Sequence, residues 1–246
     1  HACAGGPSSR VLTAADLLTA PYSLQGGEAF DVDSMFAALP DWLDVDHGGA
    51  AFDASLGAMV VTDLRFALTD APGASLRAER ALIWGGDPTA MQAVFSGAAS
   101  LTEMSQLFDR MSLENVSSEG MQWEAGMENA SLTIDKVVID GLMARSFSLA
   151  PKGETAQGVS VLRKLAGVMG SFAYDGAAYS GFSFGLNNSQ GDNVKVSVAE
   201  AFVRDYDAGA VGYQSSTGMN MLVAGFNGNP LVEVAGRKKP ENGAAK

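Results

Sequence analysis

The sequence predicts an α+β protein: a curved antiparallel sheet of about three β-hairpin repeats, with connecting amphipathic helices packed on one face. Three segments, 55–66, 112–123 and 173–184, align without gaps and agree at the positions that should be buried. Each is followed by a turn rich in Gly, Asn, Asp or Pro and then by a second apolar run, as in a hairpin with a long turn. Runs with helical spacing separate the hairpins.

Large side chains in the first strand of each unit stand two residues apart, and therefore on one face. Two columns show this: Leu64, Met121 and Phe182, then Phe66, Trp123 and Phe184. The second strands align as well, in the columns Leu76, Leu132 and Val196, then Ala78, Ile134 and Val198. We interpret Met121, Trp123, Phe182 and Phe184 as lining either a core or a ligand groove.

Three regions follow from this pattern. Residues 1–51 form an N-terminal arm with short helices, residues 52–234 the hairpin-helix repeat domain, and residues 235–246 a polar tail. The repeats lie at about 52–86, 109–142 and 171–206. In the arm, Thr13 is expected to cap a helix that ends at Leu18, Ser34 to cap a helical turn that ends at Pro40, and residues 41–49 to form a loop.

Two connecting helices are predicted. Asp87-Pro88 is a typical helix start, and an apolar stripe at helical spacing follows, first at Met91, Val94 and Phe95, then at Leu101, Met104, Leu107, Phe108 and Met111. The second helix spans 154–170. Beyond Asp205, segments 211–213, 219–226 and 231–234 read as further strands.

The formal net charge is −12 and the sequence pI is about 4.5, which disfavours nucleic acid and anionic membranes as partners. No apolar run approaches 18 residues, so no transmembrane helix is expected. The chain begins at His1 rather than Met, which suggests that a preceding segment was removed, either a signal peptide or an artificial extension. Cys3 is the single cysteine, so no intrachain disulfide can form. It is either a plain thiol or an attachment point for lipid or a second chain.

Two motifs suggest chemistry. Residues 181–185 match the G-x-S-x-G pattern of serine hydrolases, but that fold needs a histidine after the serine and none follows Ser183. Ser183 also falls in the middle of a predicted strand. No catalytic residue is assigned, and a hydrolase ranks third among the hypotheses. Asp44, Asp46 and His47 suggest Ca²⁺ or a transition metal, with a solvated acidic turn as the alternative and no cofactor as the overall expectation.

The phrases VVTDLRFALTDAPGASLRAERALIWGG and LTIDKVVIDGL resemble the serial β-hairpins of AsmA and YdgA-like bacterial envelope proteins, over about residues 52–206. The resemblance implies a protein of the periplasm, outer membrane or cell exterior that works by binding or assembly. The leading hypothesis is a non-enzymatic structural or interaction protein of the envelope that self-assembles through its sheet edges. The alternative is a carrier of lipid or another hydrophobic ligand.

Overall fold

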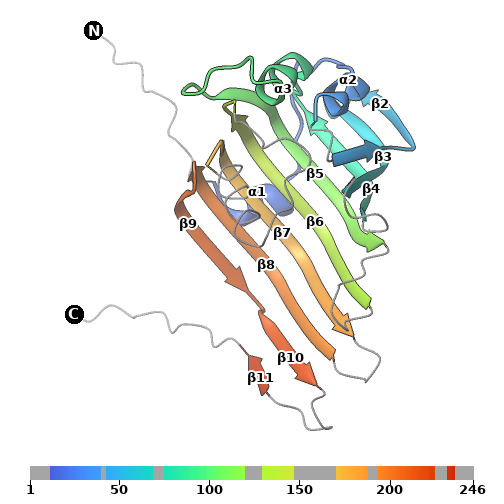
Figure 1. The fold of residues 1–246 in the computed structure, drawn as a ribbon, viewed down its shortest axis with the longest axis vertical. Coiled ribbons are helices and arrows are strands. Elements are labelled where there is room, and N and C mark those ends of the chain that lie inside the picture. The colour runs from blue at the N-terminus through green and yellow to red at the C-terminus, as the bar shows by residue number, and fades with distance from the viewer. Residues whose placement is uncertain are drawn as a thin grey trace, which may run out of the picture.

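A computed structural model of the chain describes residues 12–39, 43–68, 75–119, 129–146, 170–187, 193–224 and 232–235 (Figure 1). Its strands are β1 (Leu43–Asp46), β2 (Gly49–Asp53), β3 (Ala58–Leu68), β4 (Ser75–Trp84), β5 (Ser105–Glu119), β6 (Asn129–Ala144), β7 (Phe172–Asn187), β8 (Asn193–Asp207), β9 (Ala210–Thr217), β10 (Asn220–Ala224) and β11 (Val232–Ala235). The helices are α1 (Ala14–Leu18), α2 (Val32–Ala37) and α3 (Pro88–Phe95). The described chain is therefore mostly β rather than α+β.

All strands join one open antiparallel sheet. The order is β1-β3-β4-β5-β6-β7-β8-β10-β11, with β2 also beside β3 and β9 also beside β8. The predicted antiparallel sheet is thus confirmed, and strands consecutive in the chain are mostly neighbours. Whether three equivalent units recur in it remains a prediction.

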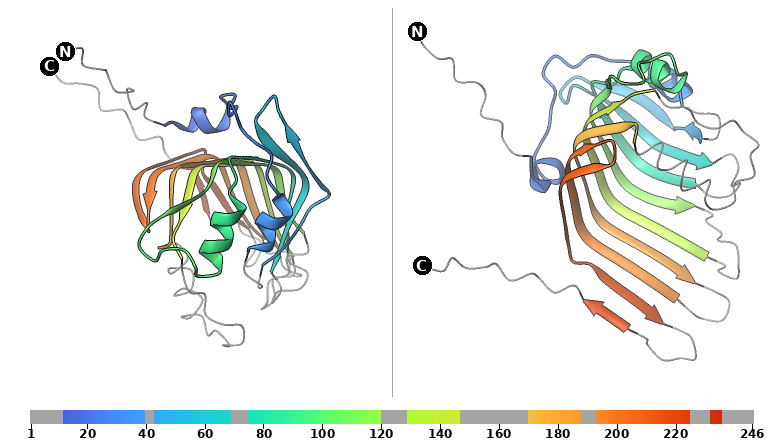
Figure 2. Two further views of the ribbon diagram at one scale, coloured as in Figure 1. Left: turned by 90° about the horizontal axis from the view of Figure 1, so that it is seen from above. Right: turned by 60° about the vertical axis from the view of Figure 1, so that its left-hand side comes forward.

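The strands are interrupted along two lines by residues with left-handed backbone conformation. The first bend line crosses alternate strands at Asp63, Asn115 and Gly181, and the second lies at Gly85, Gly141 and Asp205. Such residues kink a strand and break its period of two. Apolar residues three apart then face the same side, as Val61 and Leu64 do, because Asp63 lies between them. Figure 2 shows how strongly the strands curl.

Glycine is needed at Gly141 for two reasons. Its φ of 65° disfavours side chains. A Cβ there would also lie 2.4 Å from an Oδ2 atom of Asp175 on the neighbouring strand. The carboxylate of Asp175 thus occupies the space that a side chain at position 141 would need. The second bend line therefore requires glycine at this position.

The helices lie on both faces of the sheet (Figure 2). On the concave face, α2 and α3 supply Val32, Met35, Met91 and Val94 to the largest buried cluster, together with side chains of β3, β4 and β5. On the convex face, Leu17 and Leu18 of α1 pack against Val138, Ala178 and Phe202. The expectation that the connecting helices share one face is not confirmed, because α3 is the one connecting helix within the described residues. The second connecting helix, predicted at 154–170, lies outside the described residues except for its last position.

Locally determined features were predicted best. Thr13 caps α1 with a complete capping box, as expected. Asp87 caps α3 and Pro88 stands in its first turn, as expected. In α2 the prediction was wrong by three residues: Asp31, not Ser34, is the N-cap, because its carboxylate accepts the backbone N–H of Ser34.

Two element assignments were wrong. Residues 105–111 belong to β5, not to a helix. The pairing of β5 with β6 is irregular between Gln106 and Phe108, and Leu107, Phe108 and Met111 all reach the concave cluster. Strand side chains thereby acquire a spacing that imitates a helix. Residues 41–49 were expected to form a loop, yet Leu43–Asp46 is the strand β1, paired with β3 at the margin of the sheet. An edge strand tolerates alternating carboxylates because one of its faces meets water.

Candidate ligand-binding face

Two rows of apolar side chains cross the concave face in register. The first apolar row runs from β3 to β8 through Leu64, Ala78, Val116, Ile134, Phe182 and Val198. The second apolar row runs from β3 to β10 through Phe66, Leu76, Leu132, Phe184, Val196 and Met221, with Ser118 as its one polar member. From β3 to β8 each row spans five strand spacings of about 4.8 Å, so roughly 24 Å.

The first apolar row is buried at both ends and only half-buried at Ile134 and Phe182. Leu64, Ala78 and Val116 are 0%, 1% and 6% exposed, because α2 and α3 belong to the cluster that covers them. Phe182, farther along the row on β7, is only half-buried, whereas Val198 on β8 is 7% exposed. The second apolar row is more open, with Leu76 and Met221 exposed at 37% and 39%. None of the buried clusters found among the described residues includes Leu132, Phe182 or Phe184.

The convex face opposite these rows is polar. Ser117, Thr133, Ser183 and Ser197 stand side by side across β5, β6, β7 and β8, and Arg77 and Asn220 extend the line. The lower end of the sheet in Figure 1 is therefore amphipathic, with its apolar side on the concave face. Hydroxyl side chains are typical of a face in contact with water. An apolar face that is only half-buried is typical of a surface that binds a ligand or a partner.

Ser183 lies within β7, as predicted, with Thr133 and Ser197 as its cross-strand neighbours. Its side chain faces away from Phe182 and Phe184, because successive strand residues alternate. A serine in this position lacks the strand-to-helix turn on which the G-x-S-x-G nucleophile depends.

The candidate metal ligands lie at the opposite margin of the sheet. Asp44 and Asp46 are exposed residues of β1. His47 turns toward α2 instead, with its Nε2 2.8 Å from the carboxylate of Asp33 and its ring against Phe36. Within the described residues no group of three His, Cys, Asp or Glu side chains is arranged to hold a metal ion. Ca²⁺ binding at this place stays an untested prediction.

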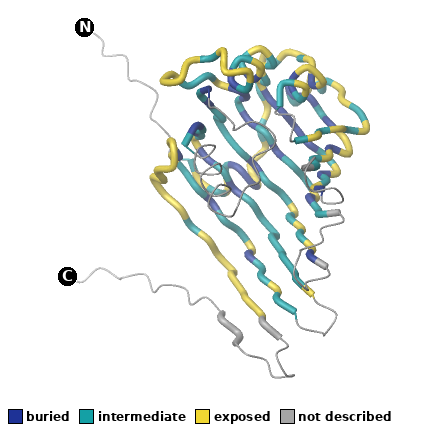
Figure 3. Tube along the Cα trace, viewed as in Figure 1, coloured by how far each residue is buried: buried dark blue, intermediate teal, exposed yellow. Residues whose placement is uncertain are grey.

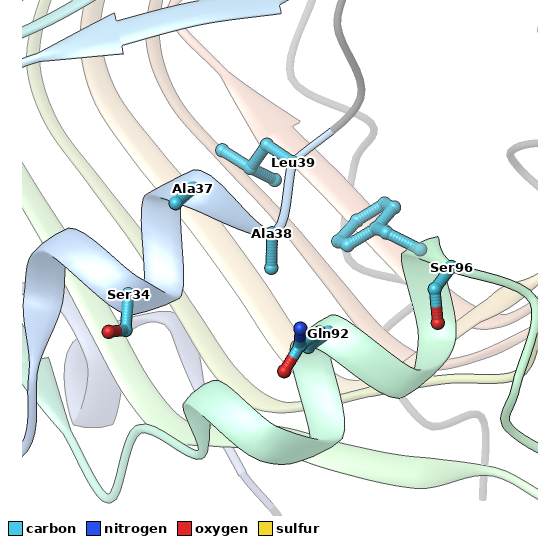
Figure 4. A pocket seen from close by; sticks show the side chains of 7 residues that line it. Ser34, Ala37, Ala38, Leu39, Gln92 and Ser96 are labelled. Atoms are coloured by element: carbon cyan, nitrogen blue, oxygen red, sulfur yellow. The ribbon is translucent and has the colours of Figure 1, made fainter.

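A hollow of about 450 Å³ opens between α2 and α3 (Figure 4). It is lined by Ser34, Ala37, Ala38, Leu39, Gln92, Phe95 and Ser96. These residues carry no formal charge, so the hollow suits a neutral group. The sequence pattern did not indicate it, because α2 and α3 are separated by the strands β1 to β4.

Three basic side chains anchor the N-terminal arm to the convex face. Arg110, Lys136 and Arg204 donate hydrogen bonds to the backbone carbonyls of Asp16, Leu18 and Leu12, at 3.4, 2.9 and 3.3 Å. These carbonyls lie in or beside the short helix α1, where backbone acceptors lack partners within the helix. The arm thereby covers Val138, Ala178 and Phe202.

Arg110 is the most buried of these cations, at 5% exposure. Its Nε lies 2.6 Å from Oδ1 of Asp140, and its guanidinium lies 3.8 Å from the ring centre of Tyr22. Burial raises the pKa of Tyr22, and the charge of Arg110 opposes that rise. Arg110 donates hydrogen bonds to Asp140 and to the backbone carbonyl of Asp16, both within the chain, which indicates a structural role.

Asp175 lies beside this cluster, on β7. Burial raises its pKa first, and the nearby carboxylates of Asp140 and Asp205 raise it further. Together with Asp109 it lies along the second bend line, where carboxylates stand over the glycines of neighbouring strands.

The candidate groove residues are placed as follows. Phe182 and Phe184 lie on the concave face, in adjacent apolar rows. The second-strand columns, with Leu132 and Val196 in one and Ile134 and Val198 in the other, coincide with these rows. In β5, however, Val116 rather than a residue near 121 stands in the row of Leu64. Met121, Trp123 and Cys3 lie outside the described residues.

Comparison of the chain with protein-family models, with curated proteins and with solved structures finds no match. Among the described helices, none combines the length and the apolar character needed to cross a membrane.

Proposed function

We propose that the protein is a non-catalytic binding protein whose concave face takes an elongated apolar ligand, such as the acyl chain of a lipid. The observation that supports this proposal is the pair of apolar rows, in register across at least five strands. Five of their members on β6, β7 and β8 are only half-buried, namely Leu132, Ile134, Phe182, Phe184 and Val196, whereas Val198 is buried. The resemblance to serial-hairpin envelope proteins favours the periplasm, the outer membrane or the cell exterior of a bacterium as its location.

The free energy gained by burying methylene groups sets a lower limit on the length of the ligand. Each buried methylene contributes about 0.8 kcal/mol, whereas association costs at least about 4 kcal/mol in lost freedom. A dissociation constant of about 1 μM corresponds to about 8 kcal/mol. A chain on the order of fifteen methylenes is therefore needed to reach micromolar affinity by burial alone. Short or branched apolar ligands fall below this limit.

Two aspartate variants of neighbouring residues test the proposal. Phe184→Asp places a charge on the concave face, and Ser183→Asp places the same charge one residue away on the convex face. Titration with a fluorescent long-chain fatty acid is expected to show saturable binding by the unmodified protein. Phe184→Asp is expected to weaken it at least about tenfold, a loss of about 1.4 kcal/mol, while Ser183→Asp leaves it unchanged. No saturable binding by the unmodified protein, with no lipid in native mass spectra, would refute the proposal.

A second candidate function is a structural or interaction module of the cell envelope that associates through the edges of its sheet. One observation favours it: β9 forms part of a sheet margin, is exposed along nearly its whole length, and contains no charged residue. Exposed edge strands pair readily with strands of other chains. The two candidates are compatible, because β9 is a margin and the apolar rows are a face.

A further inference from the structure

The strand β9 is a sheet edge without the usual protection against pairing. It is hydrogen-bonded to β8 through Arg204↔Tyr213 and neighbouring pairs, and no other described strand pairs with it. Its sequence, AVGYQSST, has neither a charged residue nor proline. Val211 and Tyr213 are 44% and 46% exposed. Natural edge strands usually carry lysine, other charges or proline, which oppose pairing with a further strand.

The other margin strands of the same sheet are short and carry acidic residues, with Asp53 in the five-residue β2 and Glu233 in the four-residue β11. The strand β1 is only four residues long and carries the exposed carboxylates of Asp44 and Asp46. On the β9 side, β10 is covered by β11 through pairs such as Met221↔Val234. Among the described strands, β9 is therefore exposed, eight residues long and uncharged, whereas β1 is short and acidic.

We infer that β9 pairs antiparallel with β9 of a second copy of this chain, across a two-fold axis at Tyr213. In this register Tyr213 faces Tyr213 of the second copy, and Val211 faces Ser215. Residues directly opposite each other share a face, so 211, 213 and 215 all stay on one side of the joined sheet. The two sheets become continuous, and the interface closes on itself, as isologous interfaces do.

The surroundings of Tyr213 favour a second tyrosine. Its ring lies 6.0 Å from that of Phe202 and 5.2 Å from the guanidinium of Arg204, yet almost half of the residue stays exposed. A tyrosine from the second copy would cover that half and form a cross-strand aromatic pair, which is one of the more favourable pairings in sheets. The register is thus specified by the largest side chain of the strand.

Charge decides between self-pairing and head-to-tail pairing. Placing β9 against β1 would bring Asp44 and Asp46 against a strand that has no cation to match them. Pairing β9 with itself brings no charges together within the two strands. The nearest carboxylates are on β8: Asp205, which is paired with Arg204, lies beside Gly212, and Glu200 and Asp207 oppose the ends of β9. Those of the two copies would be about three strand spacings apart, roughly 14 Å, beyond the screening length of about 8 Å at physiological salt.

The test uses two double variants that differ only in the sign of one charge. Val211→Lys with Ser215→Lys places like charges opposite each other at both ends of the paired region, and Val211→Lys with Ser215→Glu places opposite charges there. A short edge interface is weak, so sedimentation is measured from about 1 μM to about 1 mM. We expect the unmodified chain and the Lys/Glu variant to dimerise, and the Lys/Lys variant to need at least tenfold higher concentration.

Controls keep the outcome interpretable. Ala50→Lys on β2, at the opposite margin, is expected to leave dimerisation unchanged. Circular dichroism confirms that each variant is folded, and the Lys/Lys variant should still bind fatty acid, since β9 lies outside the apolar rows. The inference is overturned if the unmodified chain stays monomeric at about 1 mM, if the Lys/Lys and Lys/Glu variants associate equally, or if open-ended filaments form instead of dimers.

Discussion

Leu64 on β3 and Phe182 on β7 stand in the same apolar row, yet Leu64 is fully buried and Phe182 is half-buried. The difference lies in the cover. At the upper end of the sheet in Figure 3, α2 and α3 close the concave face and α1 closes the convex face. Over the lower ends of β6, β7 and β8, the described helices contribute no cover of this kind. One alternating pattern therefore produces core in one region and a candidate binding face in the other.

The largest loss of unfolding free energy is expected for Arg110, which holds α1 on the convex face at the upper end of the sheet. Arg110→Ala removes the buried partner of Asp140 and a hydrogen bond to α1. Breaking a buried ion pair from one side costs about 3–5 kcal/mol, because a buried charge is left without compensation. Urea denaturation measures this loss. A loss below about 1 kcal/mol would show that α1 is not held as described.

Truncations within the first apolar row compare the two regions directly. Leu64→Ala is expected to cost about 2–5 kcal/mol of unfolding free energy, as for other fully buried leucines. Phe182→Ala should cost less, despite its larger side chain, because a half-buried ring has less contact to lose. Both are measured by urea denaturation. Equal losses would mean that Phe182 is as well packed as Leu64, which contradicts the contrast between the regions.

The bend that joins the regions can be tested at Gly181. Its φ is 66°, and a Cβ would lie 2.0 Å from Oδ2 of Asp135. Gly181→Ala is expected to cost about 1–3 kcal/mol, measured by thermal unfolding. Gly181→Asn should lose less stability than Gly181→Ala through backbone strain, because asparagine tolerates left-handed backbone. Asn115 occupies the matching place on β5. Equal stability of Gly181→Ala and the unmodified protein would argue against the kink.

The smallest effect concerns the pH dependence of the upper region. The folded state raises the pKa of Asp175, so the folded protein holds this proton more tightly than the unfolded chain. Ionisation therefore destabilises the fold as pH rises through the interval from the ordinary carboxyl pKa to the raised one, and the lost stability returns as pH falls. Asp175→Asn should be more stable at pH 7, by up to about 0.5 kcal/mol for an exposed residue. Unfolding curves at pH 7 and pH 3 check this. The difference in stability between Asp175→Asn and the unmodified protein should be smaller at pH 3.

Sequence patterns predicted those parts of the fold that depend on neighbouring residues. The caps of α1 and α3 and the second-strand columns with Leu132 and Val196 required only local spacing. Residues 105–111 were assigned wrongly because the irregular pairing between Gln106 and Phe108 gives a strand the spacing of a helix. Such an irregularity can be predicted only when the facing strand is known, here β6 with the left-handed Gly141.

The candidate site was predictable to a similar extent. The sequence identified Phe182 and Phe184 and the side of the strand on which they lie. It did not show that Leu64 in the same row would be core, because the cover comes from α2 and α3, which lie outside the strand pattern. It also missed the lack of charge at β9, since an edge strand is recognised only once the strand order is known.

Photo-crosslinking locates the bound ligand on one face of the sheet or the other. A long-chain fatty acid that carries a diazirine near the middle of the chain is bound, irradiated and located by peptide mass spectrometry. We expect labels on concave residues of β6, β7 and β8, namely Leu132, Phe182, Phe184 and Val196, with Thr133, Ser183 and Ser197 unlabelled. Labels spread equally over both faces, or confined to the row of hydroxyls, would contradict it.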